Sequence, residues 1–247
     1  MTRIGETMAG NKLTFVDIGA RSGLQSSAEH HADRLHLVLF EPEQTEAHAL
    51  TARYGSTATV IACALGHIDT EIDLYLTKNP TCTSGLPTNQ YLLQNYGIKD
   101  HFAPAGNVKV ACRRYDTLHR DGEVPAPDIV KIDVQGFEYQ VLLGLGALLQ
   151  DAFIIQLETH FDQLYINQWL ITDLVKFLRL FDFSLRRLGN ERSPRIEASV
   201  GEDVHFDGDL VEADAIFTKN RAWLHRQTPE CQGRFREACS IMNISSY

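Results

Sequence analysis

Short apolar runs punctuate the chain, and several of them end in an acidic residue followed by a turn. The first lies within T-F-V-D-I-G-A-R-S-G at positions 14–23, which carries an acid at Asp17 and then breaks into Gly19 and Gly23. An apolar run followed by glycines predicts a buried strand that feeds a tight turn and a helix. In an open α/β sheet the ligand crevice lies at the carboxyl ends of the strands, so this turn is predicted to lie at the crevice.

Other apolar runs predict the rest of a sheet. Continuous apolar runs are typical of buried strands, and alternation of apolar and polar residues is typical of half-exposed strands. The predicted buried strands are 36–41, 57–64, 128–133 and 153–158, a half-exposed strand is 72–77, and further strands are 108–113, 183–188 and 211–218. Helical patterns lie between them at about 23–32, 43–54, 116–119, 137–149 and 169–180.

The stretch 78–107 has no clear period and collects prolines and glycines. A stretch of this length without elements of its own is uncommon in a compact domain and is often a lid or a binding loop. It therefore predicts a lid or acceptor loop in which Tyr91, Tyr96 and Phe102 line a pocket. The alternative is a helix over 88–96 that packs these rings on the core.

The order of the elements predicts one α/β domain with parallel strands. Residues 1–12 form a polar lead-in, 13–219 the predicted domain, and 220–247 a helical extension that is expected at the periphery. No internal repeat, low-complexity tract or shift of composition divides the chain of 247 residues.

Composition and charge narrow the classes of function. A hydrophobic content of 44% and a charged content of 22% are ordinary for a globular chain that buries a core. The net charge of −9 argues against a general nucleic-acid binder, which would carry a basic patch. The five scattered cysteines contain no C-x-x-C pair, so neither a zinc knuckle nor a disulfide framework is predicted. The chain shows no signal peptide and no stretch of transmembrane length, so a reduced, cytoplasmic setting is expected and a homo-oligomer is left open.

The usual dinucleotide motif, G-x-G-x-x-G, is absent from the first turn. Asp17 comes just before the first glycine instead, where it would repel a phosphate. Four predicted strands end in acids, namely Asp17, Glu41, Asp133 and Glu158. Like charges on one partly dry edge are costly unless a cation or hydrogen-bond donors accompany them. The pattern favours S-adenosylmethionine, which carries a sulfonium and an ammonium but no phosphate, while the alternative for Asp17 is a cap on the following helix.

Two motifs carry a resemblance to a known family, V-D-I-G-A-R-S-G at 16–23 and K-I-D-V-Q-G-F-E at 131–138. Supporting pieces are F-E-P at 40–42, A-L-G at 64–66, T-S-G-L around Ser84, and Glu158. On these residues the chain resembles the FkbM family of S-adenosylmethionine-dependent methyltransferases from about 13 to 218. The resemblance implies a Rossmann-like, doubly wound α/β sheet of about seven strands, mostly parallel with the last strand antiparallel, and helices on both faces. It also implies O-methylation of a hydroxyl on a small-molecule, sugar or glycan acceptor.

The resemblance further implies which residues hold the cofactor and the acceptor. Asp17 and Gly19 would lie beside the amino-acid part of the cofactor, Glu41 would bind the ribose, and the backbone of Cys63 and Ala64 would lie near the adenine. Further implied cofactor contacts are Ala20, Arg21, Gly23, Pro42 and Asp133. The implied acceptor contacts are Ser84, Gln135 and Glu138.

Two positions depart from the family's pattern. Members usually carry Asn where this chain has Arg21, and Glu where it has Gln135. Arg21 brings a permanent cation close to a positively charged ligand unless it pairs with Asp17 or with a carboxylate of the acceptor. Gln135 can orient a group but cannot accept a proton. These departures leave open a catalytically inactive, methyltransferase-like binding subunit.

A hydroxyl acceptor must lose its proton, so methyl transfer to it calls for a general base near the methyl group. The candidate catalytic residues are Asp133, Glu158 and His160, with Glu158 orienting His160 in a dyad. The alternative for His160 is a satisfied loop histidine. A second enzymatic hypothesis uses the same residues as ligands of a divalent ion that assists O-methylation, although no closely spaced ligand motif predicts a metal centre.

Overall fold

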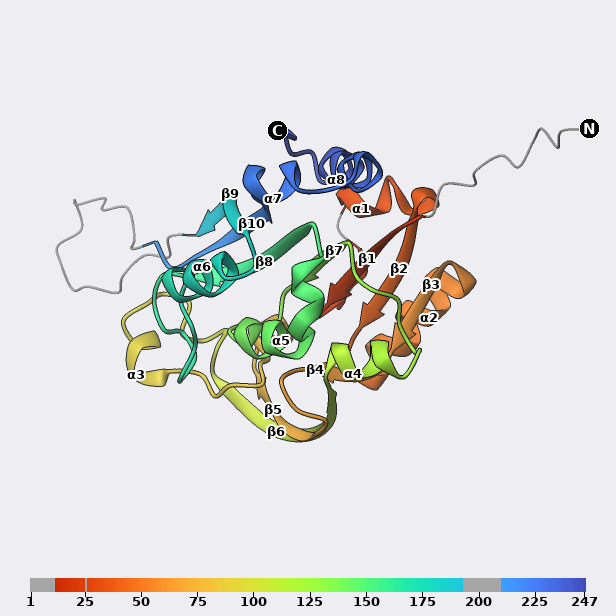
Figure 1. Cartoon of the computed structure of the whole chain (residues 1–247). Coiled ribbons are helices and arrows are strands. Elements are labelled where there is room, and N and C mark those ends of the chain that lie inside the picture. Colours follow the sequence, from red (N-terminus) through yellow and green to blue (C-terminus); the bar gives the residue numbers. More distant parts are fainter. Residues whose placement is uncertain (1–11, 25, 193–209) are drawn as a thin grey trace, which may run out of the picture.

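The computed structural model describes residues 12–24, 26–192 and 210–247. Its centre is a twisted sheet with helices on both sides, and a smaller sheet lies beyond the arrowheads of the first two strands (Figure 1). No helix in the described part of the chain has both the length and the apolar character needed to cross a membrane.

The central sheet has seven strands in the order β3-β2-β1-β7-β8-β10-β9. Its strands are β1 (Leu13–Ile18), β2 (Leu35–Phe40), β3 (Ala58–Ile61), β7 (Ile129–Ile132), β8 (Ile154–His160), β9 (Phe183–Arg192) and β10 (Glu212–Lys219). The inner pairs are parallel, and β10 runs antiparallel to both of its neighbours. This confirms the predicted Rossmann-like sheet, including the antiparallel last strand.

Alternate residues of the inner strands contribute to two separate hydrophobic cores, because successive side chains of a strand point to opposite faces of the sheet. Val16 and Val130 belong to one core, which α4 (Tyr115–Arg120), α5 (Glu138–Leu145) and α6 (Ile171–Arg179) cover. Phe15 and Ile129 belong to the other core. That face is covered by α1 (Ser26–Glu29), α2 (Gln44–Tyr54), α7 (Arg221–His225) and α8 (Pro229–Ile241).

The C-terminal helix α8 is not peripheral, contrary to the expectation from the sequence. Phe235 on α8 is fully buried, and its ring packs edge-on against Phe153 with centroids 6.0 Å apart. Arg234 Nη2 donates to Asp128 Oδ2 at 2.8 Å, and the same oxygen accepts from the backbone N–H of Thr14 at 2.8 Å. The helix is therefore fastened to the start of the central sheet.

A second sheet of three strands was not predicted as a separate unit. It consists of β4 (Ala64–Leu65), β5 (Thr70–Thr77) and β6 (Pro104–Arg113) in the order β4-β6-β5. The predicted strand 57–64 is divided, because its first part pairs with β2 in the central sheet and its end pairs with β6. The small sheet stands across the carboxyl ends of β1 and β2 (Figure 1).

The stretch 78–107 contains short elements of its own, and the helix considered over 88–96 covers only part of that range. It contains the 3-10 turn η3 (Pro80–Cys82) and the short helix α3 (Gln90–Leu93). Tyr96 and Phe102 pack in a local core, whereas Tyr91 is 83% exposed. The segment folds back on itself, since the backbone N–H of Asn79 donates to the His101 carbonyl at 3.0 Å.

Candidate functional site

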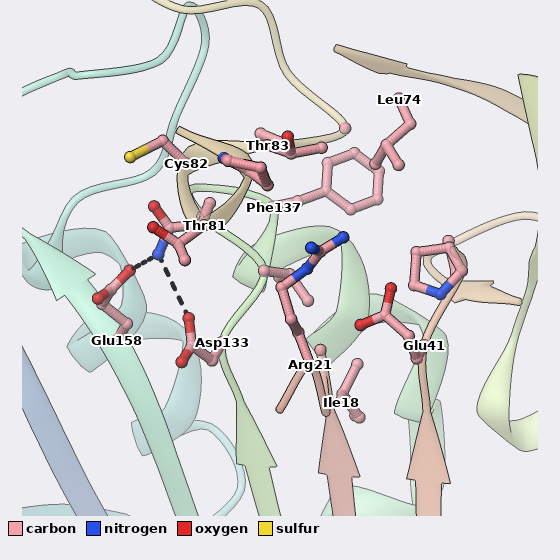
Figure 2. A pocket seen from close by; sticks show the side chains of 18 of the residues that line it. Ile18, Arg21, Glu41, Leu74, Thr81, Cys82, Thr83, Asp133, Phe137 and Glu158 are labelled. Carbon is pink, nitrogen blue, oxygen red and sulfur yellow. Dashed lines mark hydrogen bonds between the residues drawn. The ribbon is translucent and has the colours of Figure 1, made fainter. Parts of the chain in front are cut away.

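A cavity of about 640 Å³ lies at the carboxyl ends of β1, β2 and β7. Ile18, Glu41 and Asp133 line it from the central sheet, and Leu74 lines it from the small sheet (Figure 2). The segment that begins at Asn79 forms another wall. The predicted crevice is thus present, and the small sheet encloses it on the side opposite the strand ends.

Lys131 lies among the acids at the carboxyl end of the central sheet. Its Nζ is 2.9 Å from Asp17 Oδ1 and 3.6 Å from Asp133 Oδ2. Although burial favours the neutral amine, the carboxylates of Asp17 and Asp133 raise the pKa of Lys131 above its ordinary value. The lysine therefore stays charged and offsets part of the repulsion among the acids.

Gln135 connects the two acids at the ends of β7 and β8. Its Nε2 donates to Asp133 Oδ1 at 3.3 Å and to Glu158 Oε2, and both contacts appear as dashed lines in Figure 2. The hydroxyl of Tyr165 donates to Gln135 Oε1 at 2.9 Å. With φ at +56°, the backbone of Gln135 is in the left-handed region, so this strained turn aims the amide between the two carboxylates.

Glu41 and Arg21 lie on the wall that β2 and the first turn provide. Burial raises the pKa of Glu41, and the backbone N–H of Glu43 opposes the shift by donating to Glu41 Oε1 at 2.9 Å. Arg21 reaches Glu43 at 3.1 Å and Glu46 at 3.4 Å. The guanidinium is therefore paired with the N-cap residue of α2 and with an acid in its first turn, which removes the conflict expected between Arg21 and a cationic ligand.

Gly19 lies in the turn after β1, next to the backbone at the end of β7. Its φ is +79°, and a Cβ atom added there would lie 2.0 Å from the Asp133 carbonyl oxygen. No side chain fits in that space, and the left-handed backbone is itself unfavourable for other residues. The glycine therefore allows the turn after β1 to pass directly over the end of β7.

The remaining wall near β4 is neutral and largely apolar. Cys63, Ala64 and Leu65 line the cavity together with Phe137. Burial raises the pKa of the Cys63 thiol to about 12, so the thiol carries no charge at neutral pH. The Phe137 ring lies 2.9 Å from where a Cβ on Gly85 would be, and this glycine lets the chain approach the ring.

Most predicted site residues line the cavity, but four do not. The predicted residues that line it are Gly19, Arg21, Gly23, Glu41, Pro42, Cys63, Ala64, Ser84, Asp133, Gln135 and Glu158. Those outside its lining are Asp17, Ala20, Glu138 and His160, each of which is about 1% exposed or less. Their side chains are absent from the lining of the cavity, although the sequence predicted them as cofactor, acceptor or catalytic residues.

Two of the four have visible structural partners. Asp17 lies inside β1 rather than at its end and holds Lys131. Glu138 Oε1 accepts from the backbone N–H groups of Gly136 at 3.1 Å and Val134 at 3.3 Å. Glu138 therefore stabilises the turn that presents Gln135.

His160 is the last residue of β8 and not a loop residue. It is fully buried, and neither ring nitrogen has a hydrogen-bond partner among the residues that the structure describes. Its Nε2 lies 3.6 Å from Glu212 Oε2. The alternative of a satisfied loop histidine is therefore wrong, and the His160 side chain does not line the cavity.

Three residues near the site were missed in the sequence. Lys131 and Glu212 line the cavity, and Tyr165 holds Gln135. Lys131 could have been predicted from the local sequence, since a cation within an apolar run that ends in an acid needs a buried partner. No local pattern predicts that Glu212 lies at the cavity, because its position depends on the pairing of β10 with β8.

The doubly wound sheet and the cavity at its carboxyl edge define a Rossmann-like α/β protein with a ligand site at the usual place. A model of the methyltransferase FkbM domain matches residues 17–189 of this chain. The chain therefore belongs to the FkbM methyltransferase family, as the two sequence motifs suggested.

Two similar proteins illustrate the relationship. The chain is 32% identical over 93 residues to the hexuronic acid methyltransferase AglP of Haloferax volcanii, a match that covers 35% of this chain and 39% of that protein. The crystal structure of a methyltransferase FkbM from Methylobacillus flagellatus KT shares the fold, with a TM-score of 0.50 at 16% identity over 83% of this chain and 43% of the other. The chain thus spans about two fifths of the length of each protein.

Proposed function

We propose that this protein is an S-adenosylmethionine-dependent methyltransferase that transfers a methyl group to a hydroxyl oxygen of a sugar or glycan. The observation that carries the proposal is the acid-lined cavity at the ends of β1, β2 and β7, found in a chain of the FkbM family.

The residues around the cavity fit a cationic ligand without a phosphate. Asp17 Oδ2 is buried and has no hydrogen-bond partner in the described part of the chain. Asp17 bonds to Lys131 and precedes Ile18 and Gly19, all three of which line the cavity. A ligand ammonium would supply the missing donor, whereas a phosphate would be repelled by Glu41, Asp133 and Glu158.

Different walls suit different parts of this cofactor. Glu41 is held by the Glu43 N–H and would accept hydrogen bonds from ribose hydroxyls. The neutral wall at Cys63, Ala64 and Leu65 suits an adenine ring. S-adenosylmethionine would supply the electrophilic methyl group, and the turn at Gly19, with Arg21, Gly23 and Pro42, would border it.

Asp133 is the residue best suited to accept the proton of the acceptor hydroxyl. It lines the cavity, and its side chain is 39% exposed. Gln135 and Lys131 approach its two oxygens from different sides and fix its orientation. Methyl transfer is an in-line displacement in which positioning contributes much of the acceleration, so this restraint is part of the mechanism.

The acceptor would enter between Gln135 and the wall formed by Ser84 and Phe137, all of which line the cavity. The match to a protein named as a hexuronic acid methyltransferase makes a glycoside that contains a uronic acid the first acceptor to test. A neutral glycoside of the same length is its control, because it keeps the ring hydroxyls and lacks the carboxylate.

Two measurements test the proposal. Calorimetric titration with S-adenosylmethionine should show saturable binding at one site per chain. Mass spectrometry after incubation with donor and glycoside should show a gain of one methyl group on a ring hydroxyl. Absence of donor binding would overturn the proposal, and methylation of the carboxylate rather than a hydroxyl would overturn the assignment of the acceptor atom.

A further inference from the structure

Three buried side chains meet in and directly behind the wall of the cavity. They are Glu158, His160 and Glu212, and one potential ligand atom from each lies within 4.8 Å of the others. Glu158 and Glu212 are each 7% exposed, and His160 is fully buried. Two carboxylates so close together in a buried place repel each other unless positive charge accompanies them.

The sheet itself brings these residues together. Glu158 and His160 are two positions apart on β8, so their side chains leave the same face of the strand. Glu212 is the partner of His160 in the antiparallel register of β8 and β10. Residues directly opposite in such a pair have neighbouring side chains on one face. The cluster is therefore set by backbone pairing and not by flexible surface chains.

His160 provides the observation that points to a ligand. Both of its ring nitrogens are buried without a hydrogen-bond partner in the described ranges. A buried polar atom left without a partner costs about 1–3 kcal/mol. The ring is held edge-on against Tyr165, with centroids 6.1 Å apart. The His160 ring is therefore held in place by packing, while its nitrogens lack a hydrogen-bond partner or a bound ligand.

The distance between His160 and Glu212 also fits two ligands of one ion. His160 Nε2 and Glu212 Oε2 are 3.6 Å apart, which is longer than a hydrogen bond. Two ligand atoms bound to one ion at about 2.1 Å each are separated by roughly 3.0–3.4 Å. The observed separation is close to this span.

The geometry points to a divalent cation site formed by Glu158, His160 and Glu212. Carboxylate oxygens suit magnesium and manganese, and an imidazole suits later first-row ions. Manganese(II) accepts both kinds of ligand and is the ion to test first. Three protein ligands leave coordination positions open, and these would face the cavity because Glu158 and Glu212 line it while His160 lies behind them.

This site deepens the proposed function but does not require it. An ion there would stand in the cavity wall next to Gln135, which donates to Glu158. Its open positions would attract an oxygen-rich acceptor such as a sugar with adjacent hydroxyls. Binding of the ion can be measured on the protein alone, without methyl donor or acceptor.

The first test uses metal-stripped full-length protein titrated with manganese(II) and followed by electron paramagnetic resonance. We expect saturable binding of one ion per chain. Electron spin echo modulation should show coupling to one ¹⁴N nucleus, because His160 would be a direct ligand. Saturable binding without nitrogen coupling, or no binding in the micromolar to millimolar range, overturns the site.

Matched variants locate the ion. His160→Gln and Glu212→Gln keep the size of the side chains and should weaken manganese binding at least about tenfold, and His160→Gln should abolish the ¹⁴N signal. Glu46→Gln removes the same charge from an acid on α2 that pairs with Arg21 and should leave manganese binding unchanged. Equal weakening in all three variants would mean that net charge alone attracts the ion.

A second readout covers variants that fold poorly. Manganese should raise the midpoint of thermal unfolding of the wild type and of Glu46→Gln, because a ligand that binds the folded state stabilises it. Zinc(II) replaces manganese(II) for NMR because it is diamagnetic. If both ring nitrogens of His160 keep their protons after zinc(II) is added, the ring is an imidazolium paired with Glu212, and the proposal fails. Calorimetry with S-adenosylmethionine on the same samples reports separately on the proposed function.

Discussion

Lys131 Nζ donates a hydrogen bond of 2.9 Å to Asp17 Oδ1 across the parallel pair of β7 and β1. Both side chains are almost completely buried, at 7% and 0% exposed. A buried ion pair contributes little net stability compared with an apolar pair of the same size, but removal of one partner leaves an unpaired buried charge. Loss of one partner is therefore expected to destabilise the fold more than loss of both partners.

We expect Lys131→Met to destabilise the fold by about 3–5 kcal/mol because it leaves the Asp17 carboxylate without its cation. The double variant Asp17→Asn with Lys131→Met removes both charges and should recover much of the loss. Urea unfolding at pH 7.5 measures both values. If the double variant is as unstable as the single one, the lysine acts through packing and not through Asp17.

Gly19→Ala should destabilise the protein by about 3 kcal/mol, since the methyl group would meet the Asp133 carbonyl and the backbone has positive φ. The matched control is Gly189→Ala on β9, where an added Cβ meets nothing within 4 Å. Thermal unfolding of both variants checks the prediction. A stable Gly19→Ala protein would show that the ends of β1 and β7 are further apart than described.

Gln135→Glu restores the residue typical of the family and places a third carboxylate between Asp133 and Glu158. It should lower stability by about 1–3 kcal/mol at pH 8, because two donated hydrogen bonds become like-charge contacts. The new carboxyl should have a raised pKa in the folded state, so the loss is complete above that pKa and disappears as pH falls toward 4.

The uncharged variant Gln135→Met separates the two effects. It loses the same hydrogen bonds and adds no charge, so its loss of stability relative to wild type should change much less between pH 8 and pH 5. Unfolding midpoints in urea at both pH values provide the comparison. Parallel pH profiles for the two variants would exclude charge repulsion as the cause.

Glu41→Gln should weaken binding of S-adenosylmethionine by about 10–100-fold, the range for loss of hydrogen bonds to a charged group. Glu41 lines the cavity and is 4% exposed. Glu237→Gln, an acid on α8 that pairs with Arg34 outside the cavity lining, should bind the donor as the wild type does. Calorimetric titration measures both dissociation constants, and equal affinities for the two variants would remove Glu41 from the donor site.

Lys219 provides a prediction for the pH dependence of stability. Burial lowers the pKa of Lys219 to about 8 from an ordinary 10.5. Between these values the unfolded chain binds a proton that the folded chain has released, so folding stability gains from this residue as pH rises from 8 to 10.5. The gain is at most about 3 kcal/mol.

The variant Lys219→Met isolates this contribution. The wild type should gain stability relative to the variant as pH rises from 8 to 10.5, measured as the difference between their urea midpoints. Lys219 Nζ donates to the carbonyls of Leu149 at 2.7 Å and Phe181 at 2.6 Å, and these contacts favour the charged amine. A flat difference across the range would mean that they hold the pKa near its ordinary value.

The sheet and the position of the cavity could be predicted because their determinants are local. Apolar runs that end at Phe40 and Ile132 become inner strands, and the acids that follow them lie at one edge of the sheet. The glycine turn after β1 was also visible. The family motifs span this same region, so pattern and resemblance agreed on it.

Other features depend on long-range pairing that no local pattern records. The division of 57–64 follows from the pairing of Ala64 with Cys112 in the small sheet. Asp17 was expected at the end of its strand on a partly dry edge but lies inside β1, because Lys131 on β7 compensates its charge. The distinction between a residue in the wall and one behind it, as for Gln135 and Glu138, also depends on a turn with positive φ.

The insertion of β10 between β8 and β9 has a consequence for biosynthesis. Glu212 reaches the cavity only when β10 has paired with β8, although most of the other lining residues come from the first two thirds of the chain. A nascent polypeptide that has not yet emerged from the ribosome beyond this point exposes the unpaired backbone edge of β8. Such an edge invites pairing with other chains, so the growing protein is most in need of chaperone protection until β10 has emerged and paired with β8.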